Sequence, residues 1–167
     1  ITRAMKMVAG ARLNRAQQRI SAMRPHAIKI GRMLADVTAA AAERAGTGGE
    51  AEHPLLARRE QKNVLLVVIT SDRGLCGAFN ANINRFAERK WKALKEQGIT
   101  VQMAVVGRKG REYLTRRGAP VWHVFSHVWD KLGPDQAERI ASKLLVPFAA
   151  GSVDSIHLVY NEFKSAM

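Results

Sequence analysis

The chain has 167 residues, of which 47% are hydrophobic, and it carries a formal net charge of +13. This length and composition are typical of one globular domain, alone or with an appendage, and the charge favours an acidic or polyanionic partner. The longest fully apolar run, Val64–Ile69, is far too short to cross a bilayer, and the single cysteine, Cys76, excludes an internal disulfide and favours a reducing compartment.

The first 45 residues are predicted to form one long helix, Ile1–Ala45. Apolar residues recur at steps of three and four, including Ile20, Met23, Ala27, Ile30, Leu34 and Val37, which places them along one side of a helix. Pro25 is expected to kink this helix at most. A straight helix of this length spans roughly 65–70 Å. That is longer than the domain the remaining residues can build, so the helix needs a partner helix or another chain.

Every charged side chain before Asp36 is basic. A helix that only faces solvent usually mixes both signs, because opposite charges four residues apart stabilise it. Two interpretations therefore stay open. The cations form a solvated face, or they face an acidic protein surface, nucleic acid or membrane headgroups.

Beyond this helix, residues 46–63 are predicted to form a connecting loop that begins with a glycine-rich stretch, and residues 64–167 a globular domain. Apolar runs alternate with helical patterns in this domain. The predicted strands are 64–70, 100–106, 121–125 and 155–163, and the predicted helices lie around 83–94, within 107–118 and over 134–148. This alternation predicts an α/β fold, with a Rossmann-like, mostly parallel sheet and helices on both faces, preceded by the long N-terminal coiled-coil helix.

The last of these helices is predicted to begin at Pro134, a residue that suits a first helical turn. Its buried stripe is expected to comprise Ile140, Ala141, Leu144, Leu145 and Phe148.

Two glycine-containing turns follow predicted strands, where phosphate sites are often built. They are Ser71–Gly77 (SDRGLCG) and Gly107–Gly110 (GRKG). Neither has the spacing of the dinucleotide fingerprint or the P-loop. We therefore interpret the glycines as permitting tight strand-to-helix turns, and we do not expect nucleotide binding.

The remaining reactive side chains suggest no chemistry. Cys76 could be a thiolate at a helix N-terminus, but a buried, inert cysteine is the expectation. His123 and His127 fall on a strand and a loop with no cluster of acids or cysteines beside them, which argues against a metal site. We predict no catalytic residue, no cofactor and no metal, and hence a binding or mechanical module.

Several segments, taken together, resemble the gamma subunit of F-type ATP synthase. In chain order they are ITRAMKMVAGARLNRAQ, RPHA, EHPLL, VVITSDRGLCGAFNANI and VVGRKGREYL, which cover essentially the whole chain. The joint occurrence of ITRAMKMVA and SDRGLCGAFN at this separation is specific. The resemblance implies a fragment, because the family's N-terminal helix begins before Ile1 and its C-terminal helix, the coiled-coil partner of the first, follows Met167.

The resemblance also implies a function. The gamma subunit is the central rotor shaft, and it couples rotation of the c-ring to sequential conformational changes in the catalytic beta subunits, so gamma itself is not an enzyme. Its partners are the alpha, beta, epsilon (delta in mitochondrial naming) and c-ring subunits. It associates with the membrane only through the complex, on the cytoplasmic face of the bacterial inner membrane or on the matrix or stroma side of an organelle.

The matching motifs place residues in this picture. Arg3, Met5 and Lys6 lie where the family's shaft meets the moving loops of the beta subunits, and Arg12 and Arg15 are expected to continue that basic face. The globular-domain motif comprises Asp72, Arg73, Gly74, Cys76 and Gly77, to which we assign structural or coupling roles. The Gly46–Leu56 loop is expected near the membrane end.

Two other classes of protein remain as alternatives. A basic nucleic-acid-binding or interaction module would explain the charge, but it needs groove-reading side chains or stacking aromatics beside the cations, and the first helix has neither. A small-molecule enzyme on a Rossmann-like sheet would need a complete phosphate fingerprint or a catalytic constellation.

Overall fold

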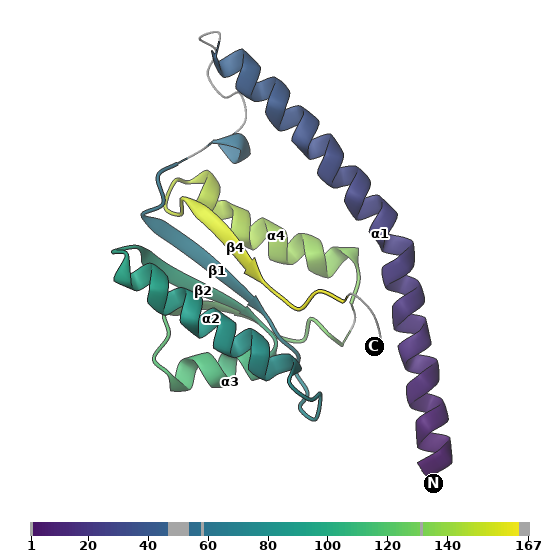
Figure 1. Cartoon of the computed structure of the whole chain (residues 1–167). Coiled ribbons are helices and arrows are strands. Elements are labelled where there is room, and N and C mark those ends of the chain that lie inside the picture. The colour runs from purple at the N-terminus through teal and green to yellow at the C-terminus, as the bar shows by residue number, and fades with distance from the viewer. Residues whose placement is uncertain (1, 47–53, 58, 131, 164–167) are drawn as a thin grey trace. The chain divides into compact units, whose positions relative to one another are not determined.

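The computed structural model describes residues 2–46, 54–57, 59–130 and 132–163 (Figure 1). The chain divides into two compact units, Ile1–Ala57 (unit 1) and Arg58–Met167 (unit 2). The finer division into 1–45, 46–63 and 64–167 stays a prediction.

Unit 1 is dominated by one helix, α1, which runs over Thr2–Gly46 without a break at Pro25. This confirms the predicted long N-terminal helix. A single 3₁₀ turn, η1 (Pro54–Leu56), follows. Residues 47–53 and 58 of the loop predicted over 46–63 lie outside the described residues.

Unit 2 is built on a four-stranded parallel sheet with the order β3-β2-β1-β4 (Figure 1). The strands are β1 (Asn63–Ile69), β2 (Thr100–Val106), β3 (Val121–Phe125) and β4 (Ser155–Val159). The last strand was predicted over 155–163 but ends at Val159. Val159 pairs with Val68, and the neighbouring strand β1 ends one residue later, so no partner strand continues beyond this point.

Helices cover both faces of this sheet, as the fold class predicted. On one face, α2 (Phe79–Glu96) and α3 (Arg108–Arg116) pack on Leu66, Val68 and Met103. On the other face, α4 (Pro134–Ala149) packs on Leu65 and Val67. Because β1 is buried on both sides, its sequence is a continuous apolar run without polar alternation.

The predicted apolar stripe of α4 is only partly right. Leu144 is buried and Ile140 and Phe148 are partly buried, but Ala141 and Leu145 are exposed. The three inward side chains are spaced four residues apart, so they form one narrow line along the helix. Ala141 and Leu145 each lie about 100° around the helix from that line.

Candidate functional site

The two glycine-containing motifs of unit 2 meet at the carboxyl edge of the sheet. Strand β1 leads into the SDRGLCG turn and β2 leads into the GRKG turn, and neighbouring parallel strands end at the same edge. Lys109 N donates a hydrogen bond to Ser71 O at 3.1 Å, and Thr70 N donates one to Val106 O at 2.8 Å. Segments about 35 residues apart in the sequence thus form one structural site.

Thr70 is the buried centre of this site. Its hydroxyl donates to Val106 O at 2.9 Å and accepts a hydrogen bond from Gly110 N at 2.8 Å, so both capacities of the group are used. The indole of Trp129 donates to Thr70 O at 2.9 Å. The sequence analysis missed Thr70, although a hydroxyl that closes an otherwise apolar strand is a signal for such a role.

Gly107 and Gly110 are required by this close contact with Thr70. Gly107 has φ 94°, and a Cβ there would collide with the backbone carbonyl of Thr70. A Cβ at Gly110 would lie 2.7 Å from Thr70 Oγ1 and 2.8 Å from Val105 Cγ1. The interpretation of glycine as permitting a tight turn is confirmed at Gly107, whereas Gly110 permits close packing of α3 on the sheet.

Asp72 caps the helix that follows β2. Its Oδ1 accepts a hydrogen bond from Arg108 N, the first residue of α3, at 2.7 Å. A carboxylate at a helix N-terminus is favoured both by the free N–H groups and by the helix dipole. A helix N-terminus often binds a phosphate, and here the chain's own carboxylate occupies it. That these turns bind no nucleotide stays a prediction.

The rest of the SDRGLCG turn is organised by Asn80, which the sequence analysis also missed. The Asn80 side chain accepts from Ser71 N at 3.0 Å and donates to Arg73 O at 3.2 Å and to Cys76 Sγ at 3.1 Å. Leu75 stands at the tip of the turn with φ 58° and a relative exposure of 110%. A polar network therefore holds an exposed apolar side chain in a left-handed conformation that leucine rarely adopts.

Cys76 is exposed, so the expectation of a buried thiol was wrong. The residue follows Leu75 in a turn that lies beyond the end of β1, outside the layers that cover the sheet. Gly74 and Gly77 complete this turn, and Gly77 has φ 58°.

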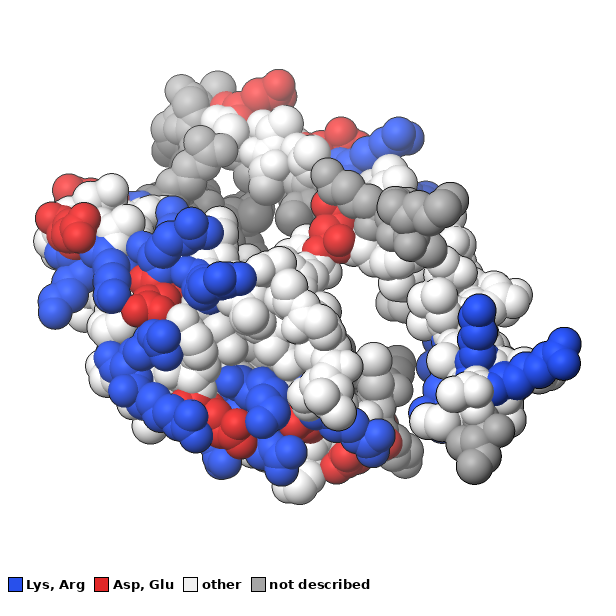
Figure 2. Space-filling view, turned by 60° about the horizontal axis from the view of Figure 1, so that its bottom comes forward, with Lys and Arg blue, Asp and Glu red and all other residues white. Residues whose placement is uncertain are grey.

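A basic cavity of about 420 Å³ lies beside the turn. It is lined by Asp72, Arg73, Arg108, Arg111, Val124, Ser126, His127 and Asp130. Both acids already have partners in the cavity wall. Asp72 accepts a hydrogen bond from Arg108 N, and Asp130 Oδ2 lies 3.0 Å from His127 Nδ1. Lys and Arg side chains likewise outnumber acids on the face of unit 2 turned toward the viewer in Figure 2. These surfaces can attract an acidic partner.

Glu88 of α2 and Glu112 of α3 form local ion pairs. Glu88 Oε1 accepts a hydrogen bond from Lys92 Nζ at 2.8 Å. Its Oε2 accepts one from Tyr113 Oη at 2.8 Å and lies 2.8 Å from Arg117 Nε. The Lys92 and Tyr113 hydrogen bonds hold the pKa of the Glu88 carboxyl below its usual range. This cluster joins α2 to α3 and is structural.

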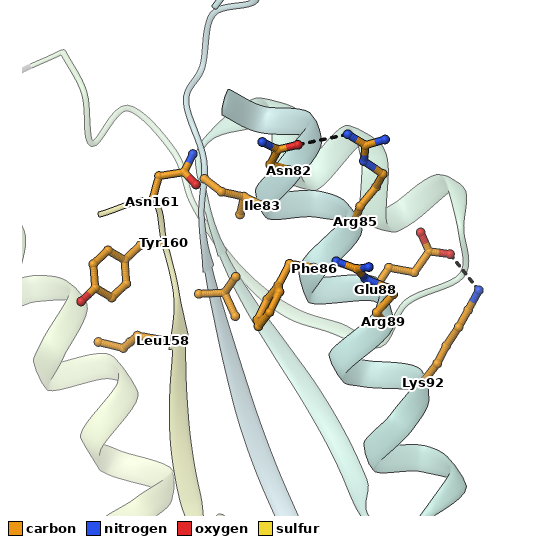
Figure 3. A pocket seen from close by; sticks show the side chains of 11 residues that line it. Asn82, Ile83, Arg85, Phe86, Glu88, Arg89, Lys92, Leu158, Tyr160 and Asn161 are labelled. Atoms are coloured by element: carbon orange, nitrogen blue, oxygen red, sulfur yellow. Dashed lines mark hydrogen bonds and ion pairs between the residues drawn. The ribbon is translucent and has the colours of Figure 1, made fainter. Parts of the chain in front are cut away.

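A second cavity, of about 750 Å³, lies between α2 and the edge strand β4 (Figure 3). Phe86, Leu158 and Tyr160 line it and are each more than half exposed. Strand β4 pairs only with β1, so its other side is an open sheet edge within the described part of unit 2.

Helix α1 carries the other predicted site residues. Arg3, Met5, Lys6, Arg12 and Arg15 are all exposed. They do not form one face, because nine residues of continuous helix turn through about 900°, which places Arg12 opposite Arg3 and Arg15 opposite Lys6. The four cations therefore point to several sides of α1. That Arg12 and Arg15 share the contact expected of Arg3 and Lys6 stays a prediction.

Large apolar side chains of α1 are exposed among the described residues. Met5, Met23, Ile30, Leu34 and Val37 have relative exposures of 67%, 69%, 64%, 57% and 56%. No helix among the described residues is both long and apolar enough to span a bilayer. Within the same residues, no three His, Cys, Asp or Glu side chains converge to hold a metal ion.

A family model and several curated relatives of this chain agree on one family. The family described as ATP synthase matches residues 1–167. The ATP synthase gamma chain of Sorangium cellulosum is 54% identical over 184 residues, which cover 100% of this chain and 57% of that relative. The gamma chains of Bdellovibrio bacteriovorus and Desulforamulus reducens are 40% and 43% identical over 100% of this chain and over 54% and 55% of their own lengths. The chain thus spans about half the length of these relatives.

Proposed function

This chain belongs to the ATP synthase gamma chain family, and we propose that it is part of the central rotor of an F-type, proton-translocating ATP synthase. In this role it couples rotation of a c-ring to sequential conformational changes in catalytic beta subunits. The observation that carries the proposal is the 45-residue helix α1, whose large apolar side chains lie exposed along its length. Such a helix is suited to pairing with a second helix as a stiff shaft inside a larger assembly.

The charge on α1 supports a rotating contact. Its cations point to several sides of the axis, so acidic loops of a surrounding ring would meet positive charge on more than one side of the shaft. Exposed charges attract weakly over long range and release easily, whereas a dry apolar interface would hold one orientation. We propose that Arg3, Met5, Lys6, Arg12 and Arg15 contact the alpha and beta subunits in this way.

The site at the carboxyl edge of unit 2 has a structural and coupling role in the proposal. Asp72 and Thr70 position α3 on the sheet, and the rigid turn presents Arg73 and Leu75 outward. Catalysis is assigned to the beta subunits rather than to this chain. Epsilon and the c-ring are the other proposed partners, and the membrane association is peripheral, through the complex, at the cytoplasmic face of a bacterial inner membrane or its organellar equivalent.

Nucleic-acid binding is the less well supported alternative. Proteins that bind single strands stack bases on aromatic side chains between the cations, and α1 has Met, Ile and Leu in those places and no aromatic residue. The two functions differ in salt dependence, since phosphate contacts respond steeply to salt.

Reconstitution of the full-length chain with alpha and beta subunits tests the proposal, with ATP hydrolysis as the measurement. We expect a large gain in hydrolysis when the chain is added, and a smaller gain for the Arg3→Gln/Lys6→Gln variant. The matched control, Lys62→Gln/Lys95→Gln, removes the same charge from unit 2 and should behave as the wild type. A chain that neither assembles with alpha and beta nor raises hydrolysis would refute the rotor function.

A further inference from the structure

We infer that two side chains, Arg59 and Asp154, clamp the first residues of unit 2 to the end of α4, and that this junction clamp transmits torque between α1 and the sheet. The inference rests on the proposed rotor function. It concerns residues that neither the sequence motifs nor the family resemblance singled out.

Arg59 is the first half of the junction clamp. Its Nη1 donates to Phe148 O at 2.7 Å and to Val153 O at 3.0 Å, and its guanidinium carbon lies 4.8 Å from the centre of the Phe148 ring. Phe148 is in the last turn of α4, where carbonyl groups lack partners within the helix and the helix dipole favours a cation. Arg59 therefore joins the chain near the unit boundary to a helix about 90 residues later.

Asp154 is the second half. Its Oδ2 accepts hydrogen bonds from Asn63 N at 2.7 Å, from Lys62 N at 3.0 Å and from Asn63 Nδ2 at 3.4 Å. The two backbone hydrogen bonds lower the pKa of this carboxyl, so it is ionised at neutral pH. Asp154 N in turn donates to Asn63 O at 2.8 Å. The carboxylate thus holds the start of β1 against the start of β4.

The position of β1 makes this junction mechanically important. It is the first strand after unit 1, and it lies inside the sheet between β2 and β4. Lys62 O also accepts a hydrogen bond from Thr100 N at 2.8 Å, so the start of β1 is tied on both sides. A force that reaches β1 from α1 is therefore shared by two neighbouring strands instead of peeling one edge strand away.

The other side-chain contacts of residues 59–62, called here the junction segment, are exposed in the part of the chain that the structure describes. Glu60, Gln61 and Lys62 are exposed, and the Glu60–Lys62 ion pair joins side chains that are 79% and 68% exposed. Gln61 Nε2 makes only a long contact, 3.5 Å, with His157 Nε2. Without Arg59 and Asp154 the junction segment would lose its side-chain hydrogen bonds to Phe148, Val153 and the start of β1, and we expect it to transmit torque less well.

The test compares two activities of one assembled complex in membrane vesicles. ATP hydrolysis requires the shaft to turn within the ring, whereas ATP-driven proton pumping also requires torque to pass through unit 2. For full-length Arg59→Ala/Asp154→Ala we expect hydrolysis near the wild-type rate and a several-fold loss of pumping per ATP hydrolysed. Asp154→Asn keeps an acceptor oxygen, so its pumping ratio should lie between those of Asp154→Ala and wild type.

The matched control is Glu60→Ala/Lys62→Ala, which removes the exposed ion pair from the same segment but keeps the Lys62 N–H. It should pump as the wild type does. If the Arg59→Ala/Asp154→Ala complex does not assemble, Arg59→Lys and Asp154→Asn carry the same test. An unchanged pumping ratio in the clamp variants, or equal losses of pumping and hydrolysis, would overturn the inference. A wild-type complex in which neither activity depends on this chain would instead refute the rotor function.

Discussion

Helix α1 and strand β1 are both rich in large apolar side chains, but they differ completely in how these are covered. Leu65 and Val67 in β1 are 0% and 1% exposed, whereas Leu34 and Val37 in α1 are 57% and 56% exposed. Burial in β1 stabilises unit 2 from within its own residues. The same type of side chain in α1 gains its stabilisation only when another helix or chain covers it. Unit 2 therefore buries its apolar side chains among its own residues, whereas those of α1 are exposed among the described residues.

The largest expected effect comes from replacing a glycine with alanine, which should destabilise unit 2 but stabilise helix α1. Gly107→Ala should destabilise unit 2 by about 3 kcal/mol or more, because the new Cβ meets the Thr70 carbonyl at a positive φ. Gly31→Ala should raise the helix content of α1, since its Cβ meets nothing within 4 Å and alanine favours a helix by about 1 kcal/mol. Urea unfolding of the 167-residue chain measures the first change and far-ultraviolet circular dichroism the second.

Gly118→Ala is the control for backbone strain without a collision, because Gly118 has φ 66° and open space around its Cβ. It should cost about 1–2 kcal/mol. A Gly107→Ala variant as stable as the Gly118→Ala variant would show that the contact between the two motifs is looser than the structure has it.

The second largest difference is expected when a leucine of each region is replaced by alanine. Leu65→Ala removes a fully buried side chain and should cost about 3–4 kcal/mol of unfolding free energy. Leu34→Ala should change it by less than about 0.5 kcal/mol but weaken self-association of the isolated chain. Tryptophan fluorescence reports on unit 2 alone, because Trp91, Trp122 and Trp129 all lie there, and sizing chromatography reports on association. A loss of several kcal/mol of unfolding free energy in Leu34→Ala would instead mean that the apolar side chains of α1 are already buried in the isolated chain.

The smallest effect concerns pH. The pKa of Glu88 is lowered from 4.5 in the folded state, so its ion pairs stabilise unit 2 above pH 4.5, and this contribution is lost as the pH falls through the folded pKa. Unfolding midpoints at pH 7 and pH 3 should therefore differ less for Glu88→Gln than for wild type. Glu60→Gln, at an exposed ion pair, is the control and should match wild type. Equal pH responses for all three proteins would contradict a role for the Glu88 cluster in joining α2 to α3.

Much of the fold could be predicted from the sequence because its signals are local. The continuous apolar runs at β1 and β2 and the three- and four-residue steps of α1 each identify an element by its own period. The strand bounds 100–106 and 121–125 match the structure. The errors arose where burial depends on neighbours: Leu145 on α4 is apolar but 37% exposed, and Cys76 in the SDRGLCG turn is exposed.

The sequence by itself determined the class of each element, the alternation of strands and helices, and the excess of cations on α1, because periodicity and charge are properties of short segments. Only the tertiary structure decided that Thr70 meets Gly107 and Gly110, that Asp72 caps α3, and that Arg59 reaches the end of α4. These contacts join residues between 36 and 89 positions apart. The strand order β3-β2-β1-β4 brings them together, and that order follows from how both faces of the sheet are covered rather than from any local pattern.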